Sequence, residues 1–355
     1  MRATSPRLAG IGLVALLAVG ATAQAADFTL KYGHVGPATE ISDDHIPGVF
    51  LKAFLENRSQ GRIAVEIYPA SQLGGFRELI EQVQLNTLEL THTTVGGMGQ
   101  FFPELQVTDI PYMLRDDLVA EKVGQSAFFD EVRDAILEST GNVRLVAVGN
   151  TGRWRSFFTA GKPIATASDM AGVKLRVIDS PLQLDFIKFM GGNPTPVAWG
   201  EVYTSLATGV VEGLNIAATD IIPNNMHEIV KYGTLDEHMY LYGFYWMSDS
   251  WLQGLPEDLQ DLVLDGVVQM AAVQADWNKQ YESRSLEEFV ASGGTIRVPT
   301  AEEKATFLEA RDAMKQWFLD NIDNAEKWLE AWESAIAEAE TEIDADRARI
   351  AGRKS

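Results

Sequence analysis

The sequence predicts an α/β fold with a largely parallel sheet, divided between two domains. Apolar residues alternate with polar ones in residues 28–34, 62–68 and 143–149, which is the period of half-buried strands. Between these segments apolar residues recur every three or four positions, as at Phe76 and Leu79, which is helical spacing. Alternation of strands and helices is typical of an α/β fold. The 355 residues exceed the length at which one hydrophobic core stops growing, about 250 to 300 residues, so we expect two domains.

A second run of alternating strands and helices begins near Asn150. The segment 173–177 has strand alternation, with Lys174 and Arg176 on one face. Ser180 and Pro181 then have the chemistry of an N-cap and a first helical residue. The apolar face of that helix is predicted to contain Leu182, Phe186, Phe189 and Met190.

Three further elements and a set of long helices complete the prediction. Residues 194–196 are expected to form a break, residues 200–207 a helix ended by Gly209, and residues 210–215 a strand. Apolar residues at helical spacing in a Glu-rich surface predict long amphipathic helices in the C-terminal third. These helices contain Trp317, Trp328 and Trp332, which would form either a partner surface or, more commonly, a face packed on the protein itself.

The N-terminus has the features of a secretory signal peptide over residues 1–25. Arg2 and Arg7 precede an apolar stretch over residues 8–19, and small residues occupy the positions before Ala26. The apolar stretch is too short to span a bilayer, and no later segment approaches the ~20 apolar residues that a membrane helix needs. We therefore predict export to the periplasm without membrane insertion.

Charge and cysteine content exclude several classes of function. The formal charge is −21, and a field of that sign repels nucleic acid and anionic lipid. The chain contains no cysteine, which rules out a lipid-modified cysteine, disulfides, thiolate metal sites and a cysteine nucleophile. Any site for an anionic ligand must therefore be basic locally.

No catalytic, metal or cofactor motif is complete. The glycines of residues 96–99 match neither a phosphate loop nor a dinucleotide turn, and His227-Glu228 lacks the second histidine of a zinc protease. Ser126 lacks the second glycine of a nucleophile elbow. Asp43-Asp44-His45 could supply metal ligands, although an acidic helix start is the commoner explanation. We expect no cofactor, no metal and no enzymatic activity.

From Phe28 onward the chain resembles the DctP family, the solute-binding proteins of tripartite ATP-independent periplasmic (TRAP) transporters. The matching segments occur in order along nearly the whole mature chain. They are residues 30–34 (LKYGH), 61–69 (GRIAVEIYP), 71–75 (SQLGG), 110–112 (IPY), 169–177 (DMAGVKLRV), 194–196 (PTP), 201–206 (EVYTSL) and 209–215 (GVVEGLN).

The resemblance implies a two-domain periplasmic binding protein of the Venus-flytrap type. Crossing strands join the two α/β domains, a long helix braces them, and the ligand lies in the cleft between them. By correspondence, domain I comprises residues 27–152 and 241–280. Domain II comprises residues 153–240 and 281–345, including the C-terminal helices.

The resemblance also assigns a carboxylate clamp. Arg176 matches the family's carboxylate-binding arginine, and a guanidinium can form two parallel hydrogen bonds with a carboxylate, which lysine cannot. A second family arginine falls at Arg155, with Arg153 as the alternative. Asn215 matches an asparagine at a strand end near the ligand, although a turn asparagine would look the same.

Four further residues fall at positions where family members contact ligand. Trp199 corresponds to an aromatic pocket residue, with a core tryptophan as the alternative. His34, Phe76 and Thr94 would contact the ligand from domain I. Phe76 replaces an acidic or polar residue of some relatives, so the resemblance does not transfer a detailed substrate.

The function implied is capture of a small organic acid, a sugar acid or a C4-dicarboxylate, and its delivery to the small and large membrane subunits of a TRAP permease driven by an ion gradient. A sensor that presents the closed form to a receptor kinase is an alternative, as is a zwitterionic ligand such as ectoine, which tryptophans would favour through cation-π contact. A periplasmic enzyme is disfavoured, because no general base or metal site accompanies Arg176.

Overall fold

The computed structural model describes residues 25–353, so the predicted signal peptide lies almost entirely outside the described residues. The strands are β1 (Phe28–Gly33), β2 (Ile63–Tyr68), β3 (Leu90–Thr93), β4 (Val143–Thr159), β5 (Lys174–Val177), β6 (Asn193–Pro196), β7 (Gly213–Ala217), β8 (Tyr232–Ser248) and β9 (Thr295–Arg297). The helices are α1 (His45–Arg58), α2 (Phe76–Gln84), α3 (Val95–Met98), α4 (Asp117–Gly124), α5 (Ala127–Thr140), α6 (Pro181–Phe189), α7 (Val202–Ala207), α8 (Asp249–Gln253), α9 (Glu257–Ala291), α10 (Ala301–Asn321) and α11 (Ala325–Ile350). Short 3-10 turns are η1 (Pro103–Asp109), η2 (Ala167–Met170), η3 (Trp199–Glu201), η4 (Ala218–Asp220) and η5 (Met226–Glu228).

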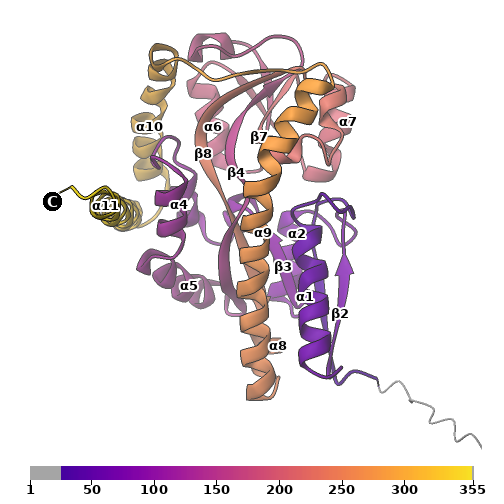
Figure 1. The fold of residues 1–355 in the computed structure, drawn as a ribbon. Helices are drawn as coiled ribbons and strands as arrows, with labels where there is room; N and C mark the ends of the chain where they lie inside the picture. The colour runs from indigo at the N-terminus through magenta and orange to yellow at the C-terminus, as the bar shows by residue number, and fades with distance from the viewer. Residues whose placement is uncertain (1–24, 354–355) are drawn as a thin grey trace, which may run out of the picture.

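The strands of the described residues form one mixed sheet in the order β2-β1-β3-β8-β4-β7-β5-β6, with β9 paired to β8. The pairs toward both ends of the sheet, β1 with β2 and β3 and β5 with β6 and β7, are parallel, as predicted. The pairs in the middle, β3 with β8, β8 with β4 and β4 with β7, are antiparallel, whereas β9 is parallel to β8. Two α/β halves are thus joined through an antiparallel centre (Figure 1).

Strands β4 and β8 cross from one half of the sheet to the other. Each is 17 residues long, and they pair from Val143 opposite Ser248 to Thr159 opposite Tyr232. The register shifts between Asn150 and Arg153, where Gly152 has a φ of +100°. A Cβ atom on Gly152 would lie 2.4 Å from the Cβ of Ala217, so this close approach requires glycine. The irregular segment bends the strands where the halves meet.

Helix α9 braces both halves along the crossing strands (Figure 1). It is 35 residues long and makes buried hydrogen bonds to β8, to β4 and to η4. Gln274 accepts from Tyr245 Oη on β8 (2.8 Å), and Asn278 donates to the main-chain oxygen of Asn150 in the bulge (3.1 Å). Ser285 donates to the main-chain oxygen of Ala218 in η4 (2.7 Å). The predicted crossing strands and bracing helix are confirmed.

The two C-terminal helices pack on different halves. Helix α10 contacts α6, and the indole of Trp317 donates to Asp185 of that helix (2.5 Å). Helix α11 contacts α4, α5 and η1 instead, with Trp328 and Trp332 buried against Phe128. The tryptophans therefore pack on the protein itself. The predicted division places α11 in domain II and α4 and α5 in domain I; the domain bounds stay a prediction.

Three local predictions in the second half were wrong. The expected break at residues 194–196 is strand β6, parallel to β5; it lies at the edge of the sheet, where a proline without an N–H is tolerated. The strand expected at residues 210–215 is β7, which begins at Gly213, and Val210 is exposed. Phe189, expected on the apolar face of α6, is 49% exposed. The buried face of α6 includes Gln183 and Ile187 instead.

Within residues 25–353, every helix is too short or too polar to cross a lipid bilayer.

The buried position of Trp332 predicts a large loss of stability for Trp332→Ala. Its ring packs against Phe128, Phe129 and Tyr242 and is fully buried. Removing it leaves a cavity, so we expect the free energy of unfolding to fall by about 3–5 kcal/mol, measured by urea denaturation. Leu319→Ala, at a position on α10 that is 37% exposed, is the control and should cost much less. A loss at Trp332 no larger than the control would contradict the docking of α11.

Candidate functional site

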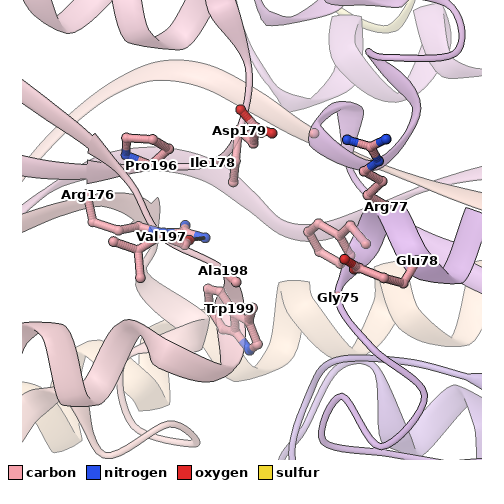
Figure 2. Close-up of a pocket in the computed structure, with 12 residues that line it drawn as sticks. Gly75, Arg77, Glu78, Arg176, Ile178, Asp179, Pro196, Val197, Ala198 and Trp199 are labelled. Atoms are coloured by element: carbon pink, nitrogen blue, oxygen red, sulfur yellow. Dashed lines mark hydrogen bonds between the residues drawn. The ribbon is translucent and has the colours of Figure 1, made fainter.

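A cleft lies where α2 and α3 of the first half face β5 and η3 of the second. Its outer part has a volume of about 410 Å³ and continues into a narrow inner part of about 30 Å³. Four side chains line both parts, namely Phe76, Arg176, Ile178 and Trp199. Figure 2 shows Arg176 and Trp199 on one wall of the outer part and Gly75, Arg77 and Glu78 on the other. Room for a small organic molecule therefore exists where the two parts meet.

A second groove, of about 520 Å³, lies between α9, α4 and the crossing strands. Two cations in its lining already have acidic partners: Lys279 pairs with Glu121 (2.7 Å) and Arg133 pairs with Asp130. The cleft differs from this groove because its buried arginines lack such partners, so we place the candidate site in the cleft.

Arg176 is a buried cation that forms no ion pair within residues 25–353, although Asp220 lies near enough to act against the lowering of its pKa. It lies on β5, where Leu175 and Val177 point into the core and Arg176 points toward the cleft. Its Nε and Nη2 donate to the main-chain oxygen of Val197, at 3.0 and 2.9 Å, and Nη1 makes no hydrogen bond within the described residues. Burial lowers the pKa of Arg176 to about 9, and the neighbouring Arg155 acts in the same direction. A carboxylate placed beside Arg176 would stabilise its charged form and so oppose the lowering of its pKa by burial and by Arg155.

Arg155, and not Arg153, lies at the cleft. Arg155 Nη1 donates to the main-chain oxygen of Asn215 (2.9 Å), while its buried Nε has no partner in the described residues. Burial lowers its pKa, although Asp109 and Asp220 oppose that shift. Arg153 instead forms ion pairs with Asp117 and Glu282 away from the cleft.

Two aromatic side chains line the cleft from opposite halves. The ring of Trp199 lies 5.5 Å from the Cζ atom of Arg176, a cation-π distance, and holds the guanidinium from one side. Phe76 is the first residue of α2 and faces the cleft from the first half, packed on the core. Trp199 is half-buried rather than a core tryptophan. Together they form apolar walls around the guanidinium.

The inner part of the cleft also contains polar groups that the sequence interpretation missed. Besides the predicted Thr94, its lining includes Asp44, His92, Thr151 and Asp220. Asp44 pairs with His92 Nδ1 (2.9 Å), and Asp43 accepts from Thr151 (2.7 Å). Asp43 and Asp44 do precede helix α1, as predicted, but their side chains are buried at the cleft and neither caps the helix.

Features of the sequence pointed to only some of these polar groups. The Asp43-Asp44-His45 sequence predicts either an acidic helix start or a group of metal ligands, and neither interpretation indicates a place at the cleft. Asp220 follows strand β7, and the carboxyl end of a strand is where ligands meet a sheet, but nothing in the sequence distinguished Asp220 from its neighbours. No group of three or more His, Asp or Glu side chains in residues 25–353 is arranged to hold a metal ion.

Burial and mutual repulsion shift the acids of this cluster in different directions. Burial, with Asp44 nearby, raises the pKa of Asp43 to about 6. Burial and the charges of Asp43 and Asp44 raise the pKa of Asp220, against the pull of Arg155 and Arg176. Burial would also raise the pKa of Asp44, but hydrogen bonds from His92 and from the Gly36 N–H (3.0 Å) outweigh it, so the pKa of Asp44 is lowered. Asp44 is therefore a carboxylate at neutral pH.

Five of the seven predicted contact residues come together in the cleft: Arg155, Arg176, Trp199, Phe76 and Thr94. The other two lie beside it. His34 contacts His45, with 3.2 Å between their nitrogens, and the Asn215 side chain contacts His238 (3.2 Å) and Gln183 (3.4 Å). Asn215 still positions Arg155 through its main-chain oxygen. Ligand contact by all seven residues stays a prediction.

The fold and sequence place the chain among known proteins. Residues 32–320 match the family model of DctP, bacterial extracellular solute-binding protein family 7. The sialic acid-binding periplasmic protein SiaP of Vibrio cholerae is 28% identical over 310 residues, covering 87% of this chain and 94% of the relative. The C4-dicarboxylate-binding periplasmic protein DctP of Rhodobacter capsulatus is 27% identical over 310 residues, covering 84% and 89%. A crystal structure of a TRAP periplasmic solute-binding protein from Desulfovibrio salexigens with bound orotic acid has a TM-score of 0.81 at 25% identity, covering 88% of this chain and 99% of that one.

The buried histidine beside the cleft predicts a pH-dependent stability. Burial lowers the pKa of His34 to about 4, while in the unfolded chain a histidine titrates near ~6.5. Between these values the unfolded chain binds the extra proton, so His34 destabilises the fold as the pH falls from about 6.5 toward 4. His34→Gln should therefore lose less stability than the unaltered protein between pH 7.5 and 5, by on the order of 1–2 kcal/mol.

Urea denaturation at both pH values measures this difference, and His227→Gln, at a partly buried position in η5, is the control. An unchanged pH profile in the His34 variant would contradict the assignment.

Proposed function

The chain belongs to family 7 of the bacterial extracellular solute-binding proteins, the DctP family of TRAP solute-binding proteins, and from this we propose that it binds a small organic acid by its carboxylate at Arg176 and Arg155 and delivers it to a membrane permease. The observation that carries the proposal is a pair of buried guanidinium groups at one cleft, neither within ion-pair distance of a carboxylate in residues 25–353. Members of this family are solute-binding proteins rather than enzymes.

The chemistry of the two arginines favours a carboxylate over a neutral ligand. Val197 accepts from one edge of the Arg176 guanidinium, which fixes its orientation and leaves Nη1 for a ligand. Arg155 keeps its Nε without a partner in the described residues. Charge-assisted hydrogen bonds to a carboxylate are shorter and stronger than neutral ones, and the geometry of a guanidinium matches the two carboxylate oxygens. A neutral sugar would leave two buried positive charges uncompensated.

Ligand binding would favour closure of the cleft, because contacts come from both halves. Phe76 and Thr94 belong to the first half, and Arg176 and Trp199 to the second. A ligand that touches both walls binds the closed arrangement more tightly than an open one, which shifts the equilibrium toward it. The bulge of β4 at Asn150–Arg153 lies between the halves and is our candidate for the hinge.

Family membership supports delivery to a permease and a periplasmic location. TRAP solute-binding proteins act outside the cytoplasm, and the predicted signal peptide agrees with export. The relatives' own ligands, sialic acid, C4-dicarboxylates and orotic acid, are all organic acids. We propose the same broad class of ligand for this chain.

Replacing Arg176 should weaken ligand binding even when the charge is kept. A thermal-shift screen would test sugar acids, dicarboxylates, keto acids, ectoines and neutral sugars; a ligand at ~100 times its Kd stabilises the protein by about 2.7 kcal/mol. For the best acid, Arg176→Lys should raise the Kd measured by calorimetry roughly 10- to 100-fold, because the two-pronged hydrogen bonding is lost.

Lys174→Ala is the matched control, since Lys174 is an exposed cation two residues away on the same strand. Stabilisation by neutral sugars alone, or acid binding that is indifferent to Arg176, would refute the carboxylate clamp.

A further inference from the structure

The charges that face the inner cleft are distributed unequally between the two halves. The cations in its lining are Arg155 and Arg176, on β4 and β5. The residues contributed by the first half include no lysine or arginine; among them are Val35, Asp44, Phe76, His92 and Thr94. A ligand whose carboxylate lies at the arginines therefore extends toward a wall without lysine or arginine.

That wall instead contains a fixed negative charge. The two oxygens of Asp44 accept from His92 Nδ1 (2.9 Å) and the Gly36 N–H (3.0 Å), which hold the carboxylate in place. This arrangement favours glycine at position 36, because a Cβ atom on Gly36 would lie 2.7 Å from Asp44 Oδ2. The pKa of Asp44 is lowered as described above, so it remains charged at neutral pH.

Two further polar groups of the same wall lack partners in the described residues. His92 Nε2 and Thr94 Oγ1 are buried and make no hydrogen bond, and both residues line the inner cleft. A hydroxyl can donate to one group and accept from the other, whereas a carboxylate only accepts. Since His92 Nδ1 donates to Asp44, Nε2 is left to accept, whereas Thr94 Oγ1 can donate or accept. A hydroxyl can therefore donate to Nε2 and accept from Thr94, and a second carboxylate cannot donate to Nε2.

In the outer cleft, as far as the structure describes it, two acids and one arginine accompany Arg176. Arg77 lies on the wall opposite Arg176 (Figure 2), and its Nε donates to Glu81 (2.9 Å) in an exposed pair. Glu78 and Asp179 line the same outer part and are both acidic. A second carboxylate directed outward would meet these two acids besides Arg77.

We propose that the ligand is a hydroxylated monocarboxylate, whose carboxylate binds Arg176 and Arg155 and whose hydroxyl groups bind Asp44, His92 and Thr94, and that Asp44 discriminates against dicarboxylates. The inference rests on the proposed function and narrows its ligand class. Repulsion between Asp44 and a second ligand carboxylate, in a site with little water to screen it, is the physical basis.

Matched pairs of acids test the inference. Galactonate and galactarate, or gluconate and glucarate, share a carbon skeleton and hydroxyl configuration and differ only in the oxidation of the last carbon. Calorimetry at pH 7.5 should give a Kd for the preferred aldonate at least about tenfold lower than for its aldarate, the factor that ~1.4 kcal/mol of repulsion produces. Equal or tighter binding of the aldarate would overturn the inference.

A variant without the Asp44 charge tests whether Asp44 causes the discrimination between aldonate and aldarate. Asp44→Asn should weaken aldonate binding and reduce the aldarate-to-aldonate Kd ratio severalfold, while Asp261→Asn, the same change at an exposed position on α9, should leave the ratio unchanged. Circular dichroism and thermal melting establish that each variant is folded; if Asp44→Asn is not, the matched pairs on the unaltered protein decide the proposal alone. An undiminished ratio in folded Asp44→Asn would refute the role of Asp44.

The failures of the two proposals are distinguishable. If no carboxylate of either kind binds, the proposed function fails. If dicarboxylates bind through Arg176 as well as or better than their matched monoacids, the proposed function stands and the hydroxylated monocarboxylate is wrong.

Discussion

The antiparallel pairing of β4 with β8 is the constraint on which the rest of the structure depends. Both strands pass through both halves of the sheet, so the parallel units at either end are held to one shared centre. Arg155 lies on β4 and Asn215, whose main-chain oxygen it contacts, lies on the adjacent β7. Helix α9 forms hydrogen bonds with β8, with β4 and with η4, the turn that follows β7. The position of the cleft is therefore set by backbone pairing rather than by its own side chains.

Burial explains how a protein with a formal charge of −21 can offer a site for an anion. Most exposed cations pair with acids, as Lys122 does with Glu342 and Arg115 with Asp344. Arg155 and Arg176 are withheld from such pairing because main-chain oxygens, which carry no net charge, hold them in place. Their charge is thus available locally, while the acidic surface around the cleft lies in water that screens it.

Most of the fold could be predicted from the sequence, because it depends on periodicity. The alternation in residues 62–68 and the Ser180-Pro181 helix start correspond to β2 and to α6. The proline-containing strand β6 could not, since a parallel edge strand of four residues has no period of its own. The irregular segment of β4 at Gly152 also could not be predicted from the sequence, because it depends on the approach of Ala217 from a distant part of the chain.

The site could be predicted only where a motif carried it. Arg176 lies in a segment that resembles the family and Trp199 lies between two such segments, and both line the cleft. Asp44 was visible as part of an acidic helix start, but its contact with His92, 48 residues away, depends on tertiary structure. Local sequence could not separate Arg153 from Arg155 either. The two arginines have different surroundings because of the register shift beside Arg153, which directs the Arg153 side chain to Asp117 and Glu282.

The attachment of α10 and α11 to different halves affects how the cleft can move. Helix α10 is fixed to α6 and helix α11 to α4 and α5, and the two are joined by a short turn in which Asn324 has a φ of +54°. Any rotation of one half must strain this turn or shift the tryptophans of α11 over their aromatic neighbours. Close-packed aromatic contacts have discrete arrangements rather than a continuum. If the cleft closes as proposed, the packing of the C-terminal helices favours two defined arrangements over a continuous range of intermediate ones.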